Sequence, residues 1–144
     1  MAEQSFANHT KMVPLFHYFV LPMLVVNFVS SIVRLVHGHH WIEGTIGVLT
    51  AAALFLLAAF ARIFALTVQD RVIRLEEQLR YQRLLPEDLK ARIPEFTRDQ
   101  FVSLRFASDT ELPVLARKVL TDKLTNRKAI KQLIQNWRAD YLRA

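Results

Sequence analysis

Two long apolar runs dominate the hydrophobic pattern, and both lie in the first half of the chain. Residues 45–60 carry no charge, and after Arg62 the apolar character resumes through Val68. An earlier run covers residues 13–36, where a few polar residues and prolines interrupt it. Each run is long enough for a helix to cross the ~30 Å hydrocarbon core of a bilayer. The pattern therefore predicts two transmembrane helices, at about residues 13–36 and 45–68.

A heptad repeat continues from the second run into the charged sequence that follows. We call this series the heptad seam; its positions, spaced alternately by four and three residues, are Gly47, Ala51, Leu54, Ala58, Ala61, Ala65, Val68, Val72, Leu75 and Leu79, and then Gln82. Small residues favour helix packing in lipid, and Val and Leu favour it in water. No Gly or Pro lies between Gly47 and Pro86. We therefore expect one helix from about residue 45 to about residue 84, a membrane span prolonged by a stalk (residues 69–84).

The sequence after the second run is charged and is broken into short segments. It holds 16 of the 19 Lys and Arg residues and 11 of the 13 acidic residues. In the stalk, Glu76 and Glu77 lie beside Arg74 and Arg80, which is typical of an exposed, salt-bridged helix. The tail that follows has helix-start signals at Pro86, Thr97–Gln100, Ser108–Glu111 and Thr125, the last opening a helix with apolar residues at Ile130, Leu133, Ile134 and Trp137.

These segments predict short amphipathic helices. A tail of about 60 residues is marginal as an independent domain. We expect it to pack against the stalk, the membrane face or a partner.

The polar residues of the first run fall on one side of the expected helix. At 100° per residue, this polar stripe spans an arc of about 100° and consists of His17, Asn27, Ser31 and Arg34. In lipid such a stripe should face protein or water. Pro22 is expected to kink the helix. The connection at residues 37–44 is short, so we expect an antiparallel two-helix hairpin with Glu43 near Arg34.

The distribution of Lys and Arg predicts the orientation. Arg71, Arg74, Arg80 and Arg83 follow the second span, while residues 37–44 contain neither Lys nor Arg. The positive-inside rule then places both termini in the cytoplasm, with residues 1–12 and 69–144 on that side. Trp41 is expected at the membrane interface, and Arg62, Arg71 and Arg74 near lipid headgroups, anionic ones in particular. The first span lacks the form of a cleaved signal peptide, so we expect it to be retained.

The residues give little support to enzyme chemistry. The chain has no Cys, no glycine-rich phosphate loop, no HExxH and no nucleophile elbow. His37, His39 and His40 form a non-specific cluster that could ligate a metal, and His17 and His37 lie where a tetrapyrrole could be bound. For these residues we favour an exposed turn and hydrogen-bonded imidazoles, so no cofactor is predicted.

Four stretches of the chain resemble a family of small, uncharacterised bacterial membrane proteins. They are RIFALTVQDRVIRLEEQLR, RLLPEDLKARI, SLRFASDTELP and RKAIKQLIQNWRADYLR, and the similarity begins at NHTKMVPLFHYFVLP. The resemblance implies two spans, a helical cytoplasmic tail and a bacterial inner membrane. It implies no activity, because that family is a domain of unknown function.

Together these features predict an all-α membrane protein without enzymatic activity that acts by protein–protein interaction. The expected role is an accessory or scaffold subunit of a larger inner-membrane complex, for example of respiratory or photosynthetic type. One alternative is a self-associating homo-oligomer. Another is a membrane-anchored nucleic-acid-binding protein, in which residues 110–120 and 126–137 form a helix-turn-helix carrying Arg127, Lys128 and Lys131. The modest positive charge of the tail favours protein and lipid partners over nucleic acid.

Overall fold

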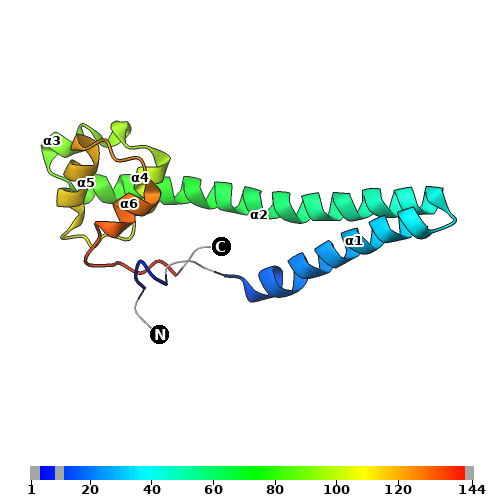
Figure 1. The fold of residues 1–144 in the computed structure, drawn as a ribbon. Helices are drawn as coiled ribbons and strands as arrows, with labels where there is room; N and C mark the ends of the chain where they lie inside the picture. The colour runs from blue at the N-terminus through cyan, green and yellow to red at the C-terminus, as the bar shows by residue number, and fades with distance from the viewer. Residues whose placement is uncertain (1–3, 9–11, 142–144) are drawn as a thin grey trace. The chain divides into compact units, whose positions relative to one another are not determined.

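The regular secondary structure is helical in the residues that the structure describes. It is a computed structural model that describes residues 4–8 and 12–141, and it divides into two compact units, Lys11–Ala65 and Leu66–Ala144 with Met1–Thr10. In order the elements are a π-helix η1 (Leu15–Val20), α1 (Leu21–His37), α2 (Trp41–Leu84), α3 (Glu87–Lys90), a 3-10 helix η2 (Ile93–Glu95), α4 (Arg98–Leu104), α5 (Leu112–Thr121) and α6 (Arg127–Gln132) (Figure 1). No strand forms within these residues; one isolated antiparallel bridge joins Ala107 and Trp137. The all-α prediction is confirmed to this extent.

The long second helix agrees with its prediction. α2 runs for 44 residues without interruption (Figure 1), beginning four residues before the expected start at Thr45. Its first turn is supported by the Thr45 hydroxyl, which donates to the Trp41 carbonyl over 2.8 Å. The apolar run and the stalk therefore belong to one helix.

The first long helix begins with a wide turn. The Leu21 amide donates to the Phe16 carbonyl, an i→i−5 bond that ends η1, and ordinary α-helical geometry follows from Leu21. Pro22 lies next to this change of register. Its ring lacks an N–H and would collide with the carbonyl four residues earlier, and a wider π turn relieves that conflict. The structure thus has a π segment immediately before Pro22, and the expected kink stays a prediction.

Within the unit Lys11–Ala65, α1 and the start of α2 approach closely near their connection at Gly38–His40. A Cβ added to Gly44 would lie 2.9 Å from the Cα of Leu35, so only glycine fits there without movement. One turn further, a Cβ at Gly47 would lie 4.0 Å from Ser31 Oγ, which is ordinary contact. Ser31 and Ala51 are both buried. Small side chains on α2 therefore allow this approach.

The second unit has its own hydrophobic core, built between the stalk and the tail. Tyr81 and Leu85 contribute from the end of α2, and the tail adds Leu89, Ile93, Phe96, Phe101, Leu104, Phe106, Leu112, Leu115, Val119, Leu120, Ile130 and Ile134. The rings of Tyr81, Phe96 and Phe101 are mutually in contact, with centroids 5.0–5.6 Å apart. The tail thus packs against the stalk, one of the three expected surfaces.

The helix starts of the tail are partly as expected. Thr97 and Gln100 form the complete capping box, each side chain accepting from the other residue's amide. At the second predicted box Ser108 Oγ accepts from the Glu111 amide, but the Glu111 carboxylate accepts from Gln135 and Asn136 instead. The box is therefore only half formed.

The last helix differs from its prediction at both ends. Asn126, not Thr125, caps α6, its side chain accepting from the amides of Lys128 and Ala129. The helix ends at Gln132, before the apolar residues at Leu133, Ile134 and Trp137. It ends early because the chain beyond it makes a backbone bridge to α4's C-terminal flank, where the Arg138 amide donates to the Phe106 carbonyl over 2.7 Å.

Candidate functional site: the two faces of the stalk

The stalk presents two opposite faces, and the tail covers only one of them. We call the covered side the inner face; its buried residues are Ile73, Glu77, Arg80 and Tyr81. At 100° per residue these lie nearly opposite the heptad seam. The seam side chains of the stalk therefore stay exposed, although Val72 and Leu79 line a cavity together with tail residues 138–141.

Two charged residues of the inner face correct the expectation of an exposed, salt-bridged stalk. Glu77 and Arg80 are each only 4% exposed. Arg80 Nη1 donates to Glu77 Oε2 over 3.0 Å, and its remaining nitrogens donate to Asp109 Oδ1 at 2.6 and 2.9 Å and to the Ala107 carbonyl at 2.7 Å. Both are buried because the tail closes over them. A stranded charge here would cost several kcal/mol, on the order of 3–5, which the surrounding partners avoid.

The charge of this cluster is balanced by residues distant in sequence. Arg138 Nη1 lies 3.6 Å from Glu77 Oε1, and Arg105 Nε donates to Asp140 Oδ2 over 2.9 Å. Burial raises the pKa of Glu77, and the nearby guanidinium groups of Arg80, Arg138 and Arg105 partly offset this effect. A cavity of about 850 Å³ adjoins the cluster and is lined by both signs of charge. These groups hold the tail on the stalk.

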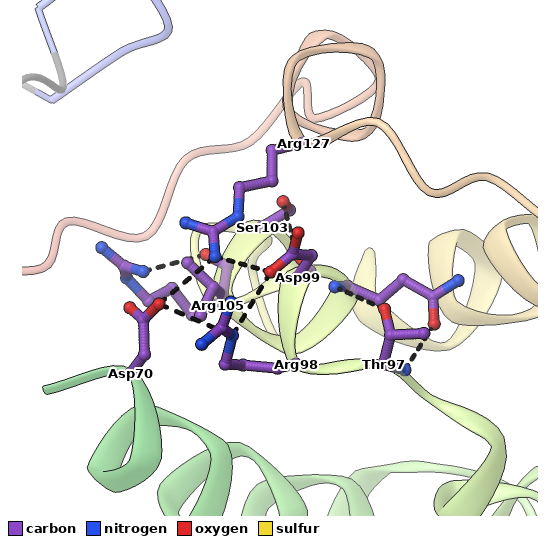
Figure 2. A network of polar contacts seen from close by, with 9 residues as sticks. Asp70, Thr97, Arg98, Asp99, Ser103, Arg105 and Arg127 are labelled. Atoms are coloured by element: carbon purple, nitrogen blue, oxygen red, sulfur yellow. Dashed lines mark hydrogen bonds and ion pairs between the residues drawn. The ribbon is translucent and has the colours of Figure 1, made fainter. Parts of the chain in front are cut away.

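A second network joins the start of the stalk to two tail helices (Figure 2). Arg127 donates to Asp99 Oδ1 over 2.6 Å and to Asp70 Oδ2 over 3.2 Å, and Arg98 lies 3.8 Å from the same Asp70 oxygen (Figure 2). The hydrogen bond from Arg127, aided by the charges of Arg127 and Arg98, lowers the pKa of Asp99. Ser103 donates to the Asp99 carbonyl over 2.7 Å within α4. Ion pairs between charged side chains thus join α2, α4 and α6.

Neither network was identified from the sequence, although a partial signal exists. Ile73, Tyr81, Leu84 and Leu85 recur with helical spacing on the inner face. This second apolar series marks a packing face that the stronger seam pattern obscures. The partners Asp109, Asp140 and Arg138 carry no such signal.

The heptad seam is divided into a covered and an uncovered part. Ala51 is buried and Gly47 is half-buried beside α1. Ala61 and Ala65 are exposed. In the stalk region the aliphatic side chains are also exposed, at 59% for Val68, 47% for Val72, and 62% for both Leu75 and Leu79. We call these four the outer stripe. The helix-packing role proposed for them thus requires a surface that this chain does not itself supply within the described residues.

Charged side chains flank the outer stripe. Arg71, Arg74 and Glu76 are exposed. Within residues 12–141, the ion pairs and hydrogen bonds of the unit's other charged residues do not involve these three side chains. Arg71 and Arg74, predicted to meet lipid headgroups, are therefore available for an external contact.

The polar stripe of the first span is partly satisfied within its own helix. Ser31 Oγ donates to the Asn27 carbonyl over 2.8 Å, and Arg34 Nη2 lies 3.5 Å from Ser31 Oγ. His17 Nδ1 is 2.8 Å from the Val13 carbonyl, at the other end of the stripe. The expected ion pair between Arg34 and Glu43 is not formed among the described residues. Only Ser31 of the stripe is buried.

The histidines form no metal centre in the described part of the chain. No group of three His, Asp or Glu side chains is arranged there to hold a metal ion, so His37, His39 and His40 do not converge. A cavity of about 490 Å³ lies beside them and includes Arg34 and Glu43 in its lining. The Nδ1 atom of His37 is 3.2 Å from the Val33 carbonyl of its own helix, whereas His17 bonds to Val13, just before its helix begins.

The remaining membrane-interface candidates lie on α2. Trp41 is its first residue and is 70% exposed, as an interfacial anchor requires. Arg62 is half-buried and lies within the apolar part of the helix. No contact among the described residues tests the interface role of Trp41 or the headgroup role of Arg62, so both stay predictions.

The basic residues of the proposed helix-turn-helix are occupied within the tail. Arg127 is bound to Asp70 and Asp99, and Lys131 Nζ lies 5.2 Å from the centroid of the Phe106 ring. α6 has only six residues and packs against α4. A recognition helix needs side chains free to reach base edges. Lys128 alone of the three basic residues is exposed.

Comparisons with known proteins bear on the family. No curated protein and no solved structure matches the chain. A family model does match, along residues 1–144, and its description is a family of unknown function. Because the match covers the whole chain, the protein belongs to this family of unknown function, DUF6526.

Proposed function

We propose that the protein is an integral membrane interaction protein without enzymatic activity. In this proposal residues 13–36 and 45–68 cross the membrane as an antiparallel hairpin, and the stalk and tail form a folded unit beside it. The observation that carries the proposal is the outward exposure of large apolar side chains along α1 and α2.

This exposure distinguishes the two helices from core helices of a water-soluble protein. Both helices are long and apolar enough to span a membrane, and their most apolar stretches have mean hydropathies of 2.1 and 2.2. Only 6% of each of these stretches is buried. Leu49, Leu57 and Phe64 are each more than 60% exposed. Apolar surface of this extent is stable only in lipid or against other proteins. α1 is short and lies near the N-terminus, as a signal sequence does. The 44-residue α2 has neither property, so a signal sequence does not account for it.

Lys and Arg crowd the side that follows the second span, which supports cytoplasmic termini. The bacterial inner membrane is what the resemblance to a family of bacterial membrane proteins implies. Trp41, Arg62, Arg71 and Arg74 then serve as interface and headgroup contacts. The outer stripe and the exposed part of the seam are the surfaces offered to other integral membrane proteins, in an accessory or scaffold role, or to a second copy.

The structure gives reasons to prefer this proposal over the nucleic-acid alternative. Arg127 and Lys131 are engaged with Asp70, Asp99 and Phe106, so the clustered free cations that counterion release requires are missing from α6. The buried clusters around Arg80 likewise join the tail to the stalk. They present no open pair of acid and base for catalysis.

Cysteine labelling tests the topology, and the chain's lack of native Cys makes each introduced thiol unique. In intact cells His39→Cys should react with an impermeant maleimide, and Arg83→Cys should react only after permeabilisation. Both positions are exposed, so burial does not explain a negative result. Reaction of Arg83→Cys alone in intact cells would overturn the orientation, and recovery of the protein in the soluble fraction would overturn the membrane proposal.

A further inference from the structure

The outer stripe has the heptad spacing of a coiled coil. In heptad notation Val72 and Leu79 occupy a positions, and Val68 and Leu75 occupy d positions. β-branched residues at a with Leu at d favour parallel dimers; Val72 and Leu75 have this order, whereas Leu79 and Val68 have the reverse one. The stripe covers eleven residue steps, about 16 Å along the helix. Its four side chains are exposed, and the opposite face of the same helix is already buried under the tail.

Two exposed charged residues beside the stripe have the spacing of an ion pair between the two helices of a coiled coil. Arg71 is at a g position and Glu76 is at the next e position, five residues later. In a parallel coiled coil a g side chain meets the partner's e side chain of the following heptad. An in-register pair therefore brings Arg71 against the partner's Glu76 twice, once on each side of the two-fold axis. In the described part of the chain, neither side chain takes part in the ion pairs and hydrogen bonds that hold the unit together.

The proposed membrane insertion supplies the orientation. Two copies inserted in the same sense present parallel stalks at the same depth, which is the register that the charge pair requires. The seam positions that precede the stripe in sequence, Ala65 and Ala61, are also exposed, and their small side chains permit close approach of backbones.

We propose that the outer stripe is a homodimer interface, in which Val68, Val72, Leu75 and Leu79 pack against the same residues of a second copy and Arg71 pairs with the partner's Glu76. This inference rests on the proposed membrane insertion and names the partner. The hydrophobic core of the tail lies on the opposite face of each stalk, whereas tail residues 138–141 line a cavity together with Val72, Glu76 and Leu79 beside the stripe. Dimerisation therefore requires no rearrangement of the tail core.

The test uses disulfide crosslinking of the full-length protein in its membrane. Leu75→Cys lies at a d position, where the two Cα atoms of a parallel dimer come within disulfide range. Arg74→Cys, the adjacent exposed position, points away from the stripe and is the matched control. Mild oxidation should crosslink Leu75→Cys into a dimer at least five-fold more than Arg74→Cys. Equal yields, or crosslinking of Leu75→Cys only to a different protein, would overturn the homodimer.

Charge reversal tests the register independently. In the Leu75→Cys background, Arg71→Glu and Glu76→Arg should each lower the crosslinked fraction several-fold, because like charges then face each other on both sides. The double reversal should restore it, whereas Lys118→Glu, at an exposed position of α5, should have little effect. Failure of the double reversal to restore crosslinking would overturn the proposed register.

The outcomes also separate this inference from the proposed function. A membrane-inserted protein with the expected labelling at His39 and Arg83 but without Leu75→Cys crosslinks would disprove the dimer alone. A protein absent from the membrane fraction would disprove the proposed function itself.

Discussion

Arg80 shows how a single residue joins the stalk to the tail. Its guanidinium contacts Glu77 on the same helix, and Asp109 and the Ala107 carbonyl from the tail. Replacement of one member of such a buried set leaves the others unpaired, which costs more than the pair itself contributes. Next to it, Tyr81 is fully buried with its ring among Phe96 and Phe101.

The Tyr81 hydroxyl yields a prediction at this scale. It is buried without a hydrogen-bond partner among the described residues, and burial raises the pKa of the phenol well above its usual value. A buried unsatisfied hydroxyl costs about 1–3 kcal/mol. Tyr81→Phe should therefore raise the free energy of unfolding by about 1 kcal/mol. Denaturation of the full chain in micelles, followed by Trp137 fluorescence in a Trp41→Phe background, measures this.

Tyr141→Phe is the matched control for that prediction. Tyr141 is 59% exposed, so its hydroxyl is solvated and its removal should change stability by less than about 0.5 kcal/mol. A loss of stability in Tyr81→Phe would show that its hydroxyl is satisfied in solution.

At the scale of elements, α1 and α2 approach each other closely at one glycine of α2 and less closely at the next. Gly44 faces the backbone of Leu35, whereas Gly47 faces the end of the Ser31 side chain with room to spare. Both lie inside a helix, where replacement of Gly by Ala is otherwise stabilising by about 0.5–1 kcal/mol. The two positions therefore separate packing from helix propensity.

Gly44→Ala should lower the free energy of unfolding by about 1–2 kcal/mol, because its Cβ would overlap the Leu35 backbone. Gly47→Ala should be neutral or stabilising. Denaturant titration in micelles, followed by Trp41 fluorescence, compares the two. If both alanines stabilise equally, α1 and α2 do not approach as closely as described.

The sequence predicts these elements unevenly, for reasons that the residues make clear. The continuity of α2 depends on local properties, the absence of Gly and Pro and a sustained heptad, and it was predictable. The burial of Glu77 and Arg80 was not, because it depends on Asp109 and Arg138, which are distant in sequence and carry no periodic signal. Ile134 and Trp137 fitted a helical period, yet a backbone bridge to Ala107 takes that segment out of helix.

At the scale of the whole molecule, acid should act on the tail in two opposite ways. Hydrogen bonds and ion pairs with Arg127, Arg117 and Arg92 lower the pKa values of Asp99, Asp88 and Glu95, respectively. Carboxylates of this kind stabilise the fold at neutral pH, and their contribution is lost as pH falls through the lowered values. Glu77 has the opposite sign. Its raised pKa means that the fold loses stability as pH rises from the ordinary value of 4.5 through the raised one.

We therefore expect the free energy of unfolding to be greatest in mild acid and to fall below about pH 4. Asp99→Asn should flatten the fall in acid, and Glu77→Gln should remove the decline that begins as pH rises above 4.5. Urea titrations of the full chain between pH 3 and 8, in micelles, measure both effects. An unchanged acid slope in Asp99→Asn would show that its ion pair does not contribute.

The position of Asp70 has a further consequence for the reach of the tail. The apolar run ends at Val68, and Asp70 is already bound to Arg127 and lies near Arg98. A domain on a flexible tether of 20 residues would explore roughly 25 Å around its anchor. This tail is not attached through such a tether, because it binds α2 itself through Arg127 and Asp70. It therefore meets a target as one folded unit with the stalk, and no linker has to be ordered when it binds.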